Sequence, residues 1–167
     1  MIRVVVDDLA FLAVDAVLRP ADENLDPVSP EAAQLDRVAG AGFASQRRVQ
    51  APLDIGAAVV TAGGDLSAQF VLHVVIRTED RPTTPDAVRR ALDSAWQRAS
   101  DWGLARLASP LVGAGPGQLA PEDSVRLLAE TWKASGASRL AEASLTLVVA
   151  REDDVEALGP LVGTAED

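Results

Sequence analysis

The stretch ARLASPLVGAGPGQLAPEDSVRLLAET, residues 105–131, predicts a strand, a glycine-rich loop and a helix in direct succession. Residues 105–112 form a short, largely apolar run, as expected of a strand that is covered on both faces of a sheet. Pro121 suits the first turn of a helix, and the carboxylates of Glu122 and Asp123 suit the positive end of its dipole. This succession is typical of an α/β protein.

The loop between the predicted strand and helix consists of Gly113, Ala114, Gly115, Pro116 and Gly117. No bulky side chain lies in this run, so a ligand can approach the backbone closely. Glycine loops between a strand and a helix often hold phosphate with backbone N–H groups. In many α/β proteins such glycines only make the turn, and the residues of the loop alone leave both interpretations open.

The rest of the chain alternates between strand and helix patterns. Apolar or β-branched runs predict five further strands, at residues 2–6, 14–18, 57–61, 69–76 and 144–150. Helices are expected over residues 30–40, from Thr84 to about residue 99, over 121–132 and as one turn at 154–158. Ser29 and Thr84 are suitable N-caps, and each is followed by a proline. The alternation favours layered α/β architecture with a parallel or mixed sheet.

The composition excludes several classes of function. The chain of 167 residues carries a net charge of −10, so we expect neither duplex nucleic acid nor a membrane as a partner. It has no cysteine and a single histidine, His73, which rules out thiol chemistry and multi-histidine metal sites. We therefore expect no metal and no cofactor. No run approaches the roughly 20 apolar residues of a membrane span, and no signal-peptide pattern is present, so we expect a cytoplasmic protein.

Three segments resemble the macro-domain family. They are VDAVLRPADENL at residues 14–25, VVTAGGDLSAQFVLHVV at 59–75 and RLASPLVGAGPGQLAPEDSVRLLAETW at 106–132. The resemblance implies a three-layer α/β/α sandwich with a mixed central sheet of about six strands. It also implies a cleft at the carboxyl ends of the strands that binds ADP-ribose or a related phosphorylated nucleoside. We expect a single domain over residues 1–158, followed by a C-terminal tail at 159–167.

The resemblance also implies which residues contact the ligand. Asp8 lies where the family has an aspartate that accepts a hydrogen bond from the adenine amino group. Residues 113–117 correspond to the loop whose backbone N–H groups meet the diphosphate. Arg19 and Asp22 fall in the segment that contacts the distal ribose. Arg19 either faces a phosphate or carboxylate of the ligand or pairs with Asp22, and a histidine at position 73 is expected to be a hydrogen-bonded structural residue.

The departures from the family pattern concern catalysis. Arg19 stands where catalytic members have an asparagine, and Ala32 stands where they have an aspartate. Pro27 and Pro30 lie in the first loop and lack the N–H that would meet a phosphate. The sequence thus predicts binding without efficient hydrolysis. Two alternatives remain. One is an ADP-ribosyl hydrolase that removes ADP-ribose from protein or nucleotide substrates, with Glu31 or Asp22 as substitute base. The other is a protein-interaction module that binds no nucleotide.

Overall fold

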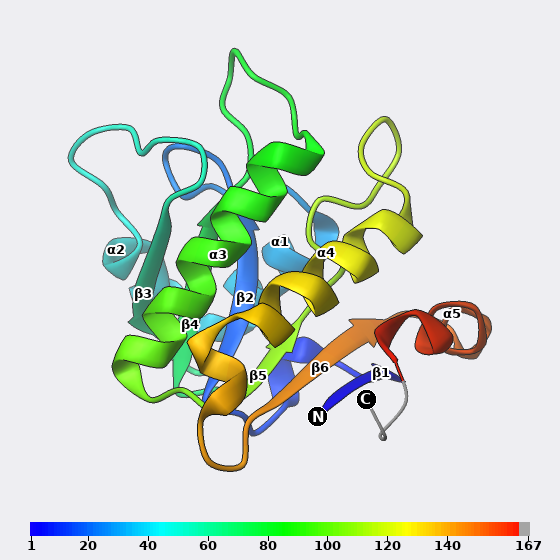
Figure 1. The fold of residues 1–167 in the computed structure, drawn as a ribbon. Helices are drawn as coiled ribbons and strands as arrows, with labels where there is room; N and C mark the ends of the chain where they lie inside the picture. The colour runs from blue at the N-terminus through cyan, green and yellow to red at the C-terminus, as the bar shows by residue number, and fades with distance from the viewer. Residues whose placement is uncertain (164–167) are drawn as a thin grey trace.

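The computed structural model describes residues 1–163. Six strands form one sheet between helical layers (Figure 1), and the three-layer α/β/α prediction is confirmed. The strands are β1 (Ile2–Val6), β2 (Ala16–Ala21), β3 (Ala58–Ala62), β4 (Phe70–Val75), β5 (Arg106–Ser109) and β6 (Ser144–Val149). The helices are α1 (Pro30–Ala39), α2 (Ala41–Gln46), α3 (Pro85–Trp102), α4 (Pro121–Ala134) and α5 (Glu152–Leu158). Short 3-10 helices occupy Leu9–Phe11, Gly136–Arg139 and Gly159–Val162.

The strand order across the sheet is β1-β6-β5-β2-β4-β3. Every neighbouring pair is parallel except β3 and β4, which run antiparallel. The first strand in the chain, β1, therefore lies beside the last, β6. Because β1, β6, β5 and β2 are parallel, their carboxyl ends meet at one edge of the sheet, where ligand sites of such folds form.

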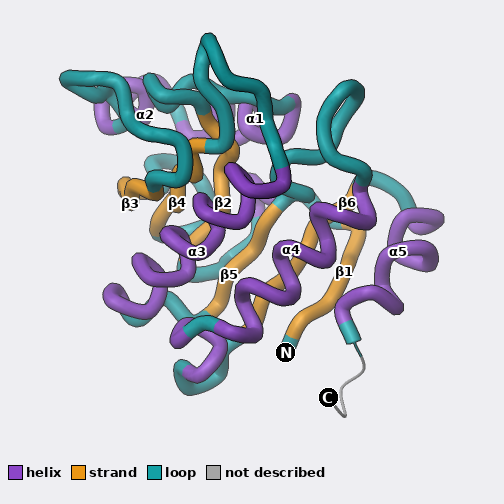
Figure 2. Tube along the Cα trace, turned by 45° about the horizontal axis from the view of Figure 1, so that its top comes forward, coloured by secondary structure: helices purple, strands orange, loops and turns teal. Residues whose placement is uncertain are grey.

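The two faces of the sheet are covered by different helices. Figure 1 shows α3 and α4 in front of the sheet and α1 and α2 behind it, and the tilted view in Figure 2 shows the same layers. Neighbouring side chains of β2 point to opposite faces: Leu18 belongs to the core cluster under α3 and α4, and Val17 to the cluster under α1 and α2. The fully buried Trp96 of α3 donates its indole N–H to Oγ1 of Thr131 in α4, at 2.7 Å.

The helix starts follow the sequence signals. The hydroxyl of Ser29 accepts a hydrogen bond from the N–H of Ala32, and that of Thr84 accepts from the N–H of Ala87, both at 3.1 Å. Each hydroxyl pairs an N–H that the first turn leaves without an intrahelical acceptor. A proline occupies the first helical position in both cases.

Several segments differ from the sequence prediction: β2 is displaced from the predicted 14–18 to Ala16–Ala21, and α2 was not predicted. The strand predicted at 105–112 ends at Ser109, because Pro110 interrupts the ladder and the chain then turns toward α4. The chain predicted as a tail from Gly159 forms a 3-10 helix through Val162, which is buried and whose carbonyl accepts from Lys133 Nζ at 2.8 Å. Packed structure therefore extends past residue 158, while residues 164–167 of the tail predicted at 159–167 lie outside the described residues.

Candidate functional site

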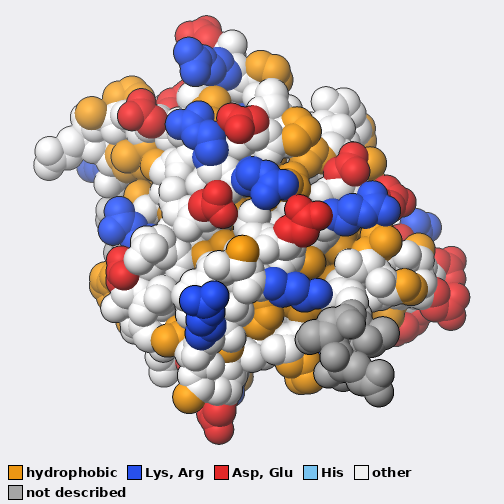
Figure 3. Space-filling model, viewed as in Figure 1, with side chains coloured by type: hydrophobic (Ala, Val, Ile, Leu, Met, Phe, Trp, Pro, Cys, Tyr) orange, Lys and Arg blue, Asp and Glu red, His pale blue; other side chains and the backbone are white. Residues whose placement is uncertain are grey.

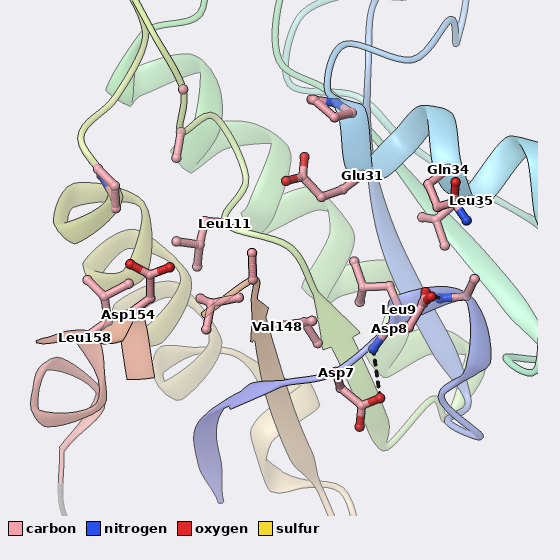
Figure 4. Close-up of a pocket in the computed structure, with 17 residues that line it drawn as sticks. Asp7, Asp8, Leu9, Glu31, Gln34, Leu35, Leu111, Val148, Asp154 and Leu158 are labelled. Carbon is pink, nitrogen blue, oxygen red and sulfur yellow. Dashed lines mark hydrogen bonds between the residues drawn. The ribbon is translucent and has the colours of Figure 1, made fainter. Parts of the chain in front are cut away.

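A cavity of about 570 Å³ lies at the carboxyl ends of β1, β6 and β5 (Figure 4). Its walls come from the segment after β1, from α1, from the loop between β5 and α4, and from the end of β6 with α5. The lining residues are Asp7, Asp8, Leu9, Ala10, Pro30, Glu31, Gln34, Leu35, Leu111, Ala114, Gly115, Pro121, Val148, Val149, Ala150, Asp154 and Leu158. We call this cavity the strand-end pocket.

Asp8 lines the strand-end pocket just after β1, and its carboxylate is held in place. Its Oδ1 caps the 3-10 helix Leu9–Phe11 by accepting from the N–H of Ala10 at 3.0 Å. The N–H of Asp8 in turn donates to Oδ1 of Asp7 at 2.8 Å, the contact dashed in Figure 4. Within residues 1–163, Oδ2 of Asp8 has no hydrogen-bond partner, so this oxygen is available to accept from a ligand N–H.

The glycine-rich loop reaches the pocket through two residues only, Ala114 and Gly115. Both N–H groups are already used inside the loop: Ala114 donates to the carbonyl of Leu111 at 3.1 Å, and Gly115 donates to that of Leu119 at 3.4 Å. In this conformation neither of these N–H groups is free to face the cleft, and the role of residues 113–117 in holding a diphosphate stays a prediction. The bond from Gly115 is long, and a phosphate oxygen that took its N–H would displace a weak contact.

Gly113 and Gly117, like Pro116, are not among the residues that line the pocket. Gly113 is buried with φ +82°, and a Cβ placed on it would meet Cγ2 of Val88 in α3 at 2.7 Å. This glycine is needed for close packing of the loop against α3. Gly117 is exposed with φ +73°, and a Cβ there would meet nothing within 4 Å, so this glycine serves the turn at the loop tip.

Arg19 is not among the residues that line the strand-end pocket, and its side chain is fully buried. The expected pairing with Asp22 is wrong: Nε and Nη2 of Arg19 bind the two carboxylate oxygens of Asp36 in α1, at 2.7 and 2.8 Å. Nη1 donates to the carbonyl of Leu25 at 2.7 Å. The guanidinium thus ties β2 to α1 and to the loop between them, and it has no face left for a ligand in this structure.

His73, in β4, contacts the buried guanidinium of Arg19 and forms a buried cluster with Arg19 and Asp36. Its Nδ1 lies 3.1 Å from Nη1 of Arg19, and its Nε2 lies 2.8 Å from Oγ1 of Thr61. A guanidinium only donates, so Nδ1 accepts and Nε2–H is the protonated nitrogen that donates to Thr61. Burial, with smaller contributions from the charges of Arg19 and Arg47, lowers the pKa of His73 from 6.5 to about 3. The imidazole is neutral and structural, as the sequence predicts.

Asp22 lies in a different hollow from the strand-end pocket. Its Oδ1 accepts from the N–H groups of Asn24 and Asp26, at 2.9 and 3.0 Å, and so closes a turn. The hollow is lined by Asp22, Glu23, Asn24, Arg77, Thr78, Glu79, Asp80 and Pro82. Of the two acidic residues considered as substitute bases, only Glu31 lines the strand-end pocket.

The electrostatics of the strand-end pocket are one-sided. Four carboxylates line it, those of Asp7, Asp8, Glu31 and Asp154, and of the described lining residues none is a lysine, arginine or histidine. Within residues 1–163, no group of three or more histidine, aspartate or glutamate side chains is arranged to hold a metal ion. No helix in that part of the chain has the length and apolar character needed to cross a membrane.

Sequence reasoning missed the contributions of α5, where Asp154 and Leu158 line the pocket. The signal was present but weak: residues directly after a buried strand such as β6 lie at the edge of the sheet where the site forms. Gln34 and Leu35, one turn after Glu31 in α1, were missed for a similar reason. Helical spacing brings their side chains near that of Glu31.

Comparison with known proteins identifies the family. Residues 19–128 match the model of the Macro domain family. The chain belongs to this family. A protein of Aeropyrum pernix is 31% identical over 127 residues, which cover 75% of this chain and 67% of that protein. A protein of Mycobacterium tuberculosis is 28% identical over 121 residues. This macro domain spans about a third of the length of the mycobacterial relatives.

Solved macrodomains share the fold. A Trypanosoma brucei macrodomain superposes with a TM-score of 0.81 at 21% identity, covering 97% of this chain and 67% of that one. An Oceanobacillus iheyensis macrodomain with ADP gives a TM-score of 0.78 at 16% identity, covering 95% of this chain and 88% of that one. The resemblance predicted from three short segments is therefore confirmed for the family and for the fold.

Proposed function

We propose that the strand-end pocket binds ADP-ribose or a related phosphorylated nucleoside and does not hydrolyse it efficiently. The observation that carries this proposal is the position of Asp8 in the pocket, with one carboxylate oxygen fixed as a helix cap and the other unpartnered within residues 1–163. That oxygen suits the amino group of adenine. Support also comes from solved macrodomains with ADP, from Oceanobacillus iheyensis and Trypanosoma brucei.

The diphosphate would lie along the loop between β5 and α4. Ala114 and Gly115 line the pocket there without bulky side chains. The hydrogen bond from the N–H of Gly115 to the carbonyl of Leu119 is the longer of their two, so this N–H is the easier one to transfer to a phosphate oxygen. Hydrogen bonds to charged oxygens contribute about 1.5–3 kcal/mol each. A small rearrangement of this loop would therefore accompany binding.

Weak hydrolysis is proposed from the residues that occupy the expected catalytic positions. Arg19 is fully buried and paired with Asp36, and Ala32 is a fully buried position in the first turn of α1. Neither can position a water for attack on the distal ribose. The hydrolase alternative retains one candidate base, because Glu31 lines the pocket.

Calorimetric titration with ADP-ribose tests the binding proposal directly. We expect saturable heat and thermal stabilisation of the folded domain, since a ligand that binds only the native state raises its stability. Absence of both at millimolar ADP-ribose would contradict nucleotide binding and favour the protein-interaction alternative.

Incubation with mono-ADP-ribosylated protein tests the second half of the proposal. We expect little release of ADP-ribose. Release that scales with the protein and is abolished in Glu31→Ala, but retained in Asp22→Ala, would support the hydrolase alternative instead. An ADP-ribosylated protein as a further partner, the absence of duplex nucleic acid and membrane partners, and a cytoplasmic location all stay predictions from the sequence.

A further inference from the structure

Glu31 is the carboxylate of α1 that enters the strand-end pocket. Figure 4 shows its side chain leaving the helix and pointing into the cavity, toward the wall that contains Leu111. It is exposed, and within residues 1–163 it takes part in no ion pair and no side-chain hydrogen bond. Glu31 therefore carries a negative charge that no cationic side chain of residues 1–163 pairs, at the wall opposite the loop between β5 and α4.

Neighbouring carboxylates add to the negative potential that Glu31 creates in the pocket. The other charged residues that line the pocket are Asp7, Asp8 and Asp154. The first turn of α5 at its edge adds Glu152 and Asp153 beside Asp154, and the one cation paired there is the exposed Arg151, whose Nε lies 3.7 Å from Oδ2 of Asp154. Figure 3 shows Asp and Glu side chains gathered where α5 lies, whereas charges of both signs are interspersed over α3 and α4. Anionic ligands thus meet a like-charged site, and each further charge on the ligand weakens binding.

We infer that Glu31 determines the specificity of the strand-end pocket by disfavouring ligands that end in a terminal phosphate group. The inference rests on the proposed function and names the ligand class within it. Both phosphates of ADP-ribose are esterified and carry one charge each. The terminal phosphate of ADP is substituted on one oxygen only and has a second pKa of about 6, so ADP carries an additional charge at neutral pH.

The size of the effect follows from the Coulomb interaction. Two unit charges about 10 Å apart at an effective dielectric constant of about 35 change an affinity on the order of fivefold. The N-terminal dipole of α1 favours an anion at this wall, but Ser29 already caps the N–H of Ala32, and Pro30 has no N–H to offer. The charge of Glu31 is therefore the larger influence on an approaching phosphate.

The experiment measures adenosine, ADP-ribose and ADP by calorimetric titration against the unmodified protein, Glu31→Gln and Asp93→Asn. Adenosine is the uncharged reference ligand. Asp93→Asn is the matched control, because Asp93 is an exposed residue of α3 that does not line the pocket. In Glu31→Gln we expect the affinity for ADP, relative to ADP-ribose, to rise about fivefold, and the gain to shrink as salt is added.

Each outcome decides the inference. An unchanged ratio of ADP to ADP-ribose affinity in Glu31→Gln, or an equal change in Asp93→Asn, overturns it while leaving the proposed function intact. Failure of adenosine, ADP-ribose and ADP alike to bind any of the three proteins overturns the proposed function, and with it this inference. A thermal melt of each variant verifies that the change in ratio is not a change in folding.

Discussion

Nη1 of Arg19 lies 3.1 Å from Nδ1 of His73, with both side chains fully buried. This contact fixes the imidazole as a neutral acceptor and places a permanent positive charge next to it. The carboxylate of Asp36 neutralises that charge through two hydrogen bonds. The family resemblance connects position 19 with the ligand. In this protein the side chain of Arg19 instead joins β2, β4 and α1 through hydrogen bonds.

Replacing Arg19 with alanine should destabilise the domain strongly. The change leaves the carboxylate of Asp36, in a largely buried site, with only the longer contact to Nε of Arg47 at 3.7 Å. Breaking a buried ion pair on one side typically costs about 3–5 kcal/mol. Urea unfolding measures the loss. Arg89→Ala is the matched control: it removes an exposed ion pair with Glu130, and a loss below about 1 kcal/mol is expected. Equal losses of unfolding free energy in the two variants would show that the buried Arg19–Asp36 pair contributes no more to stability than an exposed ion pair.

Stability should fall with pH below about 6.5 because of His73. Its pKa is about 3 in the folded protein and 6.5 as the ordinary value, so between these values the unfolded chain binds a proton that the native protein does not. The stabilisation is complete above pH 6.5 and is lost as pH falls toward 3. Between pH 7.5 and 5 the loss should be about 2 kcal/mol.

The single histidine makes this prediction directly measurable. The imidazole C–H proton resonances should show no titration between pH 7.5 and 5 in the native protein, and they should titrate normally in urea. In His73→Gln, the dependence of unfolding free energy on pH over this range should be largely absent. A native-state titration near pH 6.5 would contradict the buried, neutral assignment.

Asp8 should matter for the base of the ligand. Asp8→Ala removes the free Oδ2 and should weaken adenosine and ADP-ribose roughly tenfold to a hundredfold, the value of one hydrogen bond to a charged acceptor. Ribose 5-phosphate, which has no amino group, should be affected less. Because Asp8 also caps a 3-10 helix, Asp8→Asn is the informative companion: it preserves the cap but replaces the charge. Equal weakening of all ligands in Asp8→Ala would argue against a contact with the base.

The loop between β5 and α4 offers a steric test. Ala114→Leu adds bulk at a half-buried pocket wall and should weaken ADP-ribose at least tenfold while the melting temperature stays within a few degrees. Gly115→Val is less suitable, because Gly115 has φ +151° and a β-branched residue there is strained. Gln118→Ala, which changes the same loop outside the lining, should leave binding unchanged. Undiminished binding by Ala114→Leu would place the diphosphate elsewhere.

The fold was predictable because its signals are local. Ser29 and Thr84 each precede a proline and a helical apolar pattern, and both cap their helices as expected. The partner of Arg19 was not predictable: Asp36 is 17 residues away, and only the docking of α1 brings it to β2. Asp22 is nearer in sequence, but its carboxylate accepts from the backbone of its own turn.

The candidate site was predictable in outline and not in detail. Asp8 follows a strand and lies at the sheet edge, as the pattern predicts. The ligand contacts of the glycine loop were predicted only in part, because the sequence does not distinguish a glycine needed for packing from one needed for ligand approach. Gly113 is needed for packing, and this is evident only in the folded structure, where a Cβ on it would meet Cγ2 of Val88 in α3.

The pairing of β1 with β6 has a consequence for how the protein is made. A ribosome synthesises residues 2–6 before every other strand of this sheet, yet they have no strand to join until residues 144–149 have emerged. Asp8 and Asp154 both line the pocket, and they are therefore brought together only after almost the entire domain has been translated. A nascent chain stalled before β6 would contain the glycine loop and α1 and yet have no complete cleft, so ligand could not assist its folding until that final strand was inserted.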